Sequence, residues 1–320
     1  MRAQQKRKPR YKRAPTHSLR LQERDKEIIH QVYRYRFLNS RQIDSLVEGS
    51  SQRILRRLGG LFHEDYLSRP IEQIRPYKTG SEPMIYGIGN KGIEILKNEF
   101  AIPKNKIDWT RKNRGVRQIY LDHQMMISNF MVCLELACKN RNDVEFLSRE
   151  KVGEDLSGKL MNGSTAKWKV EVQRKGKGSG KVGLSVIPDK VFGLYFPNKP
   201  PGKRRALFFL EADRSTMPVV RSNLYRSSFY KKLVGYWESY RQDLFKEYFG
   251  LKGARVLTVT KSQQRIDNMI EANKKMDERG RGLRMFLFAT QDEITSEDPD
   301  RILKGIWKDG RGENTASLMD

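Results

Sequence analysis

The chain has 320 residues and a formal net charge of +25 at pH 7, because 63 Lys and Arg outnumber 38 Asp and Glu. Such an excess attracts polyanions, and duplex DNA is a dense line of phosphates, so we expect double-stranded DNA as a partner. No apolar stretch approaches the roughly 20 residues of a membrane helix, and the basic start lacks the hydrophobic core of a secretory signal, so we expect a cytoplasmic protein without membrane contact.

Residues 1–23 are predicted to form a basic, disordered tail. Lys and Arg recur in MRAQQKRKPRYKR, beside Pro9 and Pro15 and very few apolar side chains. Mutual repulsion and poor burial favour disorder in isolation. The tail either lies along DNA phosphates or serves as a solubilising or targeting segment.

Residues 24–100 are predicted to form one domain that begins with three helices. Apolar side chains recur at helical spacing in RDKEIIHQVYRYRF and RQIDSLVEG, and a third helix starts at Ser50 or Ser51. We expect its inward side to carry Ile54, Leu55, Leu58 and Leu61. Its outward side carries the residue types that contact base edges and phosphates when a recognition helix enters the major groove: Gln52, Arg53, Arg56 and Arg57.

Two strand-like runs then flank a turn-rich tip, RPYKTGSEP, and the helical run GIEILKNEF closes the domain. This order resembles winged helix-turn-helix domains. The resemblance implies that Arg75 and Lys78, on the wing, lie against the DNA backbone or minor groove. The alternative is a winged helix that only contacts proteins. Residues 101–118 are polar, basic and interrupted by Pro and Gly, which predicts a linker.

A second domain is predicted over residues 119–293, followed by a polar C-terminal tail over residues 294–320. Its helical and strand-like runs alternate, which predicts a mixed sheet with helices on both faces and an α+β or α/β class for the whole chain. Cys133 and Cys138 lie in one apolar helical run without a Cys/His cluster, so neither a zinc site nor a disulfide framework is indicated.

Carboxylates mark two apolar runs of this second domain. Asp189 follows Pro188 on one run, and Glu211 lies near the end of the next, with Asp213 two residues later. A β-hairpin would bring Asp189 and Glu211 together, and Asp213 would share the face of Glu211 because alternate strand positions do. Paired carboxylates are ligands for Mg²⁺, so these two residues are candidate metal ligands.

This spacing resembles the PD-(D/E)XK nuclease fold, with Asp189 and Glu211 on the acidic positions. Where that pattern has a lysine, this chain has Asp213, so whether the chain is an enzyme stays open. Lys232, near the buried edge of the next helix, is a candidate substitute. His123 is a further candidate acid/base group or ligand, the alternative being a buried histidine that satisfies local hydrogen bonds.

The full arrangement resembles the replication-relaxation family of plasmid and mobile-element proteins over roughly residues 24–290. The resemblance rests on the order of IYGIGNKGIEIL, Leu121-Asp122-His123, PD and FLEADRST. It implies a DNA-binding factor in replication or relaxation, with a nuclease-like domain and replication or mobilisation proteins as partners. The alternatives are an active Mg²⁺-dependent DNA endonuclease and a winged-helix transcriptional regulator. The oligomeric state stays open, a dimer included.

Overall fold

The computed structural model describes residues 10–14, 19–74, 82–103, 107, 117–139, 141–148, 151–152, 166–173, 180–221 and 226–320. The chain divides into two compact units, residues 1–132 and 133–320. Both contain helices and strands, and the second contains a mixed sheet, so the expected mixed class is confirmed. No helix among the described residues is long and apolar enough to cross a membrane.

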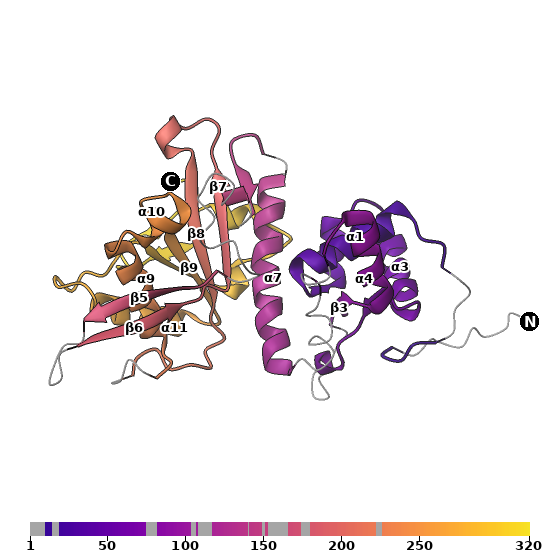
Figure 1. Ribbon diagram of the computed structural model, residues 1–320, viewed down its shortest axis with the longest axis horizontal. Helices are drawn as coiled ribbons and strands as arrows, with labels where there is room; N and C mark the ends of the chain where they lie inside the picture. The colour runs from indigo at the N-terminus through magenta and orange to yellow at the C-terminus, as the bar shows by residue number, and fades with distance from the viewer. Residues whose placement is uncertain are drawn as a thin grey trace, which may run out of the picture. The chain divides into compact units, whose positions relative to one another are not determined.

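Four helices of the first unit pack around an apolar core (Figure 1). They are α1 (Glu23–Tyr35), α2 (Ser40–Leu46), α3 (Ser51–His63) and α4 (Asn90–Phe100). On α3, Ile54, Leu58 and Leu61 are fully buried, as periodicity predicts. The prediction for Leu55 is wrong, because 49% of this residue is exposed.

The three-stranded antiparallel sheet of the first unit has the order β1-β3-β2. Its strands are β1 (Leu38–Asn39), β2 (Leu67–Ser68) and β3 (Ile85–Ile88). A short 3-10 turn, η1 (Ile71–Gln73), follows β2. The Gln73 side chain accepts a hydrogen bond from the Ile85 amide at 2.8 Å and donates to its carbonyl at 3.1 Å. This amide therefore bridges the two chain segments that lead into and out of residues 75–81.

Part of the basic N-terminal segment contacts the first unit. Arg13 donates a hydrogen bond to the Phe62 carbonyl at 2.7 Å and pairs with Asp65. Its guanidinium also lies 4.9 Å from the centroid of the Phe62 ring. Residues 10–14 are thus held against the end of α3, in contrast to the disorder expected for this segment.

Seven described strands of the second unit form one mixed sheet with the order β12-β11-β10-β9-β8-β7-β4. The central strands β8, β9 and β10 are parallel to one another, and the remaining neighbours are antiparallel. The strands are β4 (Glu145–Leu147), β7 (Lys190–Tyr195), β8 (Arg205–Ala212), β9 (Arg255–Thr260), β10 (Phe286–Thr290), β11 (Trp307–Asp309) and β12 (Thr315–Ala316). The segment expected to be a polar C-terminal tail therefore supplies two strands of this sheet, with Trp307 fully buried.

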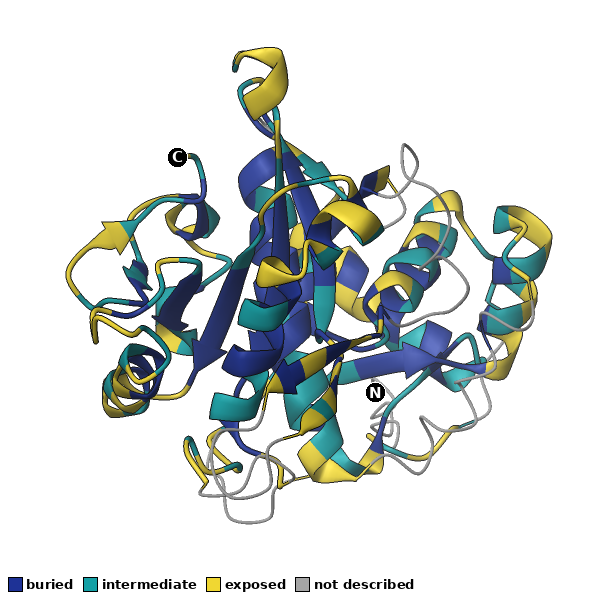
Figure 2. Cartoon of the chain, turned by 60° about the vertical axis from the view of Figure 1, so that its left-hand side comes forward, coloured by how far each residue is buried: buried dark blue, intermediate teal, exposed yellow. Residues whose placement is uncertain are grey.

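A separate hairpin and α9 (Phe229–Arg241) complete the part of the core that positions the site. The hairpin pairs β5 (Trp168–Gln173) with β6 (Lys181–Val186), and α9 contacts both strands. Trp168 donates a hydrogen bond to the Ser239 hydroxyl at 2.7 Å, which fixes the hairpin to the helix. The strands of the sheet are largely buried, whereas the outer faces of the helices are exposed (Figure 2). Two further helices are α10 (Leu244–Phe249) and α11 (Gln263–Lys274).

Candidate functional site

The outward side of α3 is an exposed, purely basic and polar surface apart from one leucine. Gln52, Arg53 and Arg56 are exposed there, and we refer to these three side chains as the basic face of α3. Within the described residues, neither arginine has an ion-pair partner. No Asp or Glu occurs anywhere in α3, so the positive charge of this face is uncompensated by its own helix.

Arg57 differs from the other arginines of α3 because it is engaged inside the unit. Its Nε donates to Oδ1 of Asp25 at 2.9 Å, and its Nη2 contacts the second carboxylate oxygen. Asp25 is fully buried and also accepts a hydrogen bond from the Gln22 amide at the start of α1. Arg57 therefore links α3 to α1, whereas the three residues of the basic face are exposed.

The structure brings Asp189 and Glu211 together through the register of two antiparallel strands. Lys190 pairs with Leu210 between β7 and β8, so Asp189, one residue before β7, lies opposite Glu211. The Asp189 carboxylate accepts a hydrogen bond from the Ala212 amide at 2.8 Å. Asp189 is half-buried, whereas Glu211 is 2% exposed. We refer to these two residues as the acidic pair.

Two side chains of α9 contact Glu211 from the covering layer. Lys232 forms an ion pair with one carboxylate oxygen, and the Tyr236 hydroxyl donates to the other at 2.5 Å. Burial raises the pKa of Glu211, although Lys232 opposes that rise. Burial also lowers the pKa of Lys232, but Glu211 and Asp189 outweigh it and leave that pKa raised. Lys232 thus stays protonated and supplies the charge that balances Glu211.

Lys232 and Tyr236 meet the same carboxylate because they are four residues apart on one helix, where side chains lie one above the other. Lys232 was anticipated from its place beside the buried stripe of α9. Tyr236 is not among the site residues predicted from the sequence, and its spacing of four residues from Lys232 is the signal that could have indicated a shared partner.

In this arrangement the oxygens of the acidic pair are hydrogen-bonded to groups of the protein itself. Mg²⁺ is held by carboxylate oxygens together with waters or substrate phosphates. Both oxygens of Glu211 already accept hydrogen bonds from Lys232 and Tyr236, and Asp189 accepts one from the backbone. Across the described parts of the chain, no group of three or more His, Cys, Asp or Glu side chains could hold a metal ion. The cation that balances Glu211 here is the Lys232 ammonium.

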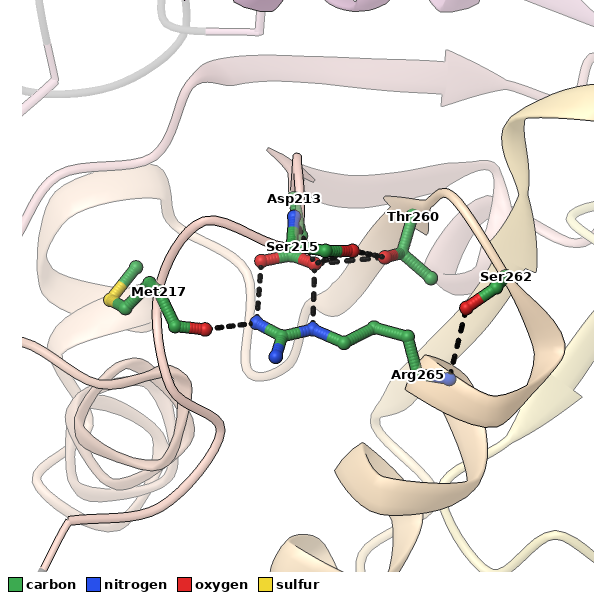
Figure 3. Close-up of polar contacts among 6 residues, drawn as sticks. All are labelled: Asp213, Ser215, Met217, Thr260, Ser262 and Arg265. Atoms are coloured by element: carbon green, nitrogen blue, oxygen red, sulfur yellow. Dashed lines mark hydrogen bonds and ion pairs between the residues drawn. The ribbon is translucent and has the colours of Figure 1, made fainter.

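Asp213 is committed to a different network, which Figure 3 shows. Its carboxylate accepts two hydrogen bonds from Arg265 of α11, from Nε at 2.9 Å and Nη2 at 3.0 Å. It also accepts from the Thr260 hydroxyl at 2.8 Å and from the Ser215 amide at 3.1 Å. Arg265 donates further to the Met217 carbonyl at 2.5 Å. Asp213 therefore ties the loop after β8 to the start of α11 and has little capacity left for another ligand.

His123 is half-buried on α7 (Gln118–Lys139), in the part of that helix that belongs to the first unit. Arg75 and Lys78 lie outside the described residues.

Comparison with known proteins gives one family. The family model described as replication-relaxation matches residues 29–253. This span begins within α1 and ends just before β9, so it contains the basic face of α3, the acidic pair and Lys232. No curated protein and no solved structure matches the chain.

Proposed function

Because the chain belongs to the replication-relaxation family, we propose that it binds double-stranded DNA during plasmid or mobile-element replication or relaxation. The observation that carries this proposal is the basic face of α3, whose two arginines have no partner within the described residues. Unpaired guanidinium groups on an exposed helix suit both phosphates and guanine edges. The net charge of +25 adds a general attraction to DNA.

We further propose that the first unit is a winged helix-turn-helix domain with α3 as its recognition helix. The order of α1, β1, α2, α3, β2 and β3 supports this, as does the antiparallel pairing of β2 with β3. In such domains the recognition helix enters the major groove with its first turns against the bases. Gln52, Arg53 and Arg56 all lie in the first two turns of α3.

The test is fluorescence anisotropy of labelled duplex DNA with the full chain. Arg53→Ala and Arg56→Ala should each weaken binding by roughly 5- to 150-fold, corresponding to about 1–3 kcal/mol for a base-reading arginine. Arg279→Ala is the matched control, because it removes the same charge from an exposed position of the second unit. Equal effects of all three variants would contradict the assignment of α3 as the DNA-binding helix and would indicate non-specific attraction by charge alone.

For the second unit we propose a restriction-endonuclease-like fold that serves binding or assembly rather than hydrolysis. The mixed sheet, the α9 connection between parallel strands β8 and β9, and the position of the acidic pair support the fold. The engagement of Glu211 by Lys232 and Tyr236 supports the lack of hydrolysis. Replication or mobilisation proteins are the partners that this role would require.

An active Mg²⁺-dependent DNA endonuclease is the second candidate. It is favoured by the meeting of Asp189, Glu211 and Lys232 in one cluster, since two acids and a lysine are the groups of a PD-(D/E)XK site. Incubating supercoiled plasmid with wild type and Asp189→Ala, in Mg²⁺, Mn²⁺ or EDTA, separates the two candidates. Metal-dependent nicking that is lost in the variant would establish the nuclease, whereas DNA binding without nicking supports the primary proposal.

A further inference from the structure

The basic face of α3 borders one large apolar side chain that is half exposed. Leu55 is 49% exposed, whereas its neighbours Ile54 and Leu58 are fully buried and supply the contacts of α3 with the core. Leu55 lies three residues after Gln52 and directly before Arg56. On a helix, side chains three residues apart are neighbours, about 5–6 Å between Cβ atoms. At 100° per residue Gln52 and Arg56 lie 60° and 100° from Leu55 on one side, and the buried Leu58 lies 60° away on the other, so Leu55 sits at the border between the core side and the polar side of α3.

The chemistry of the major groove offers one apolar group for such a side chain. Base edges there carry hydrogen-bond donors and acceptors, and thymine adds its 5-methyl group. Gln52 suits an adenine edge, and Arg56 suits a guanine edge or a phosphate. A leucine beside them can cover a methyl group on a neighbouring base pair without leaving a polar atom unsatisfied.

The surroundings of Leu55 favour DNA over a protein as its cover. A protein surface that covers Leu55 would also have to face the adjoining polar side of α3, where Arg56 has no acidic partner within the described residues. One turn later, Gly59 leaves the outer side open, since an added Cβ would meet only Arg69 Nη2 at 4.0 Å. A surface that is basic and carries one apolar side chain at its edge fits a groove lined by phosphates.

We infer that Leu55 is a specificity-determining residue that contacts the 5-methyl group of a thymine in the duplex bound by α3. This inference rests on the proposed function and adds to it a base that the protein distinguishes. It assigns part of the sequence preference to an apolar contact, beside the hydrogen bonds of Gln52 and the arginines.

The test removes the methyl group from the DNA and the leucine from the protein. A duplex is first selected from a random pool with the full wild-type chain. Each thymine is then replaced, one at a time, by deoxyuridine, which lacks only the 5-methyl group. At one position wild type should lose about 3- to 5-fold in affinity, the value of one buried methyl-sized group. The Leu55→Ala variant should bind the unmodified duplex more weakly and be indifferent to deoxyuridine there, while Leu55→Met should keep the sensitivity.

The possible outcomes distinguish a failure of the Leu55 contact from a failure of the proposed DNA binding. If wild type selects no duplex, the proposed function fails and the inference with it. If wild type binds but no deoxyuridine position matters, or Leu55→Ala keeps the same sensitivity, the inference alone is overturned. A Leu55→Ala variant that binds DNA normally but changes its sedimentation would assign Leu55 to a protein interface and also overturn it. Since Leu55 is half exposed, thermal unfolding should show each variant folded.

Discussion

Replacing Lys232 by methionine removes the charge that balances Glu211 and keeps much of the apolar stem of the side chain. Glu211 is 2% exposed, and among the described residues the Tyr236 hydroxyl is the donor that remains to its carboxylate after the change. Removing one partner of a buried pair costs about 3–5 kcal/mol. Lys232 itself is 35% exposed, so solvent screens part of the interaction and we expect about 2–3 kcal/mol at neutral pH.

The pH dependence of this loss follows from the direction of the pKa shift. Burial raises the pKa of Glu211 above its unfolded value, and Lys232 limits that rise, so the variant carboxyl should have a still higher pKa. A raised carboxyl pKa costs stability as the pH rises through it, because the folded state then holds a buried charge. The deficit of Lys232→Met should therefore be largest near neutral pH and shrink in acid, where Glu211 is protonated in both proteins.

Urea unfolding followed by tryptophan fluorescence measures this difference, since the ring of Trp168 lies 6.3 Å from that of Tyr236. Lys246→Met on α10 is the charge-matched control, because Lys246 is exposed, and it should change the unfolding midpoint little at any pH. A Lys232→Met deficit that is absent, or that does not vary with pH, would refute the assignment of Lys232 as the counterion of Glu211.

Three further predictions concern single side chains. Arg57→Ala should lower the free energy of unfolding by about 3–5 kcal/mol in chemical denaturation, because it leaves the fully buried Asp25 without its ion-pair partner. If Arg57 only contacted DNA, its replacement would leave stability unchanged. Gly59→Ala should raise the free energy of unfolding by up to about 1 kcal/mol, because the residue is helical and an added Cβ would meet no atom closer than 4.0 Å. A clear loss of stability would contradict that geometry. Arg265→Lys should destabilise the second unit by about 1–3 kcal/mol in the same assay, because lysine cannot form the two-point contact with Asp213, and wild-type stability would refute that role.

Apolar periodicity was sufficient to predict α1, α2 and α3, because each packs one continuous stripe against the core. It could not place Leu55, which is as apolar as Leu58 but lies outside the stripe that the other helices cover. It also could not separate Arg57 from Arg53. At 100° per residue Arg57 lies only 40° from the buried Leu61, which places it at the edge of the buried stripe. Its ion-pair partner, Asp25, belongs to α1, so spacing within α3 does not reveal it.

In the second unit the sequence indicates the acidic pair because a hairpin register relates two neighbouring runs of the chain. The partner of Asp213 could not be predicted in the same way. Arg265 lies 52 residues later, and the contact depends on β9 aligning parallel to β8 so that α11 starts beside Asp213. Sheet order decides such contacts, and residue spacing alone does not reveal it.

Arginine footprinting of the wild-type chain tests most directly whether α3 binds DNA. Phenylglyoxal modifies exposed guanidinium groups, and mass spectrometry reads each site with and without a selected duplex. In the free protein Arg53, Arg56 and Arg279 should react readily, and Arg57 slowly because it is paired with buried Asp25. Bound DNA should protect Arg53 and Arg56 and leave Arg279 reactive. Protection of Arg279 with full reactivity of Arg53 and Arg56 would contradict it.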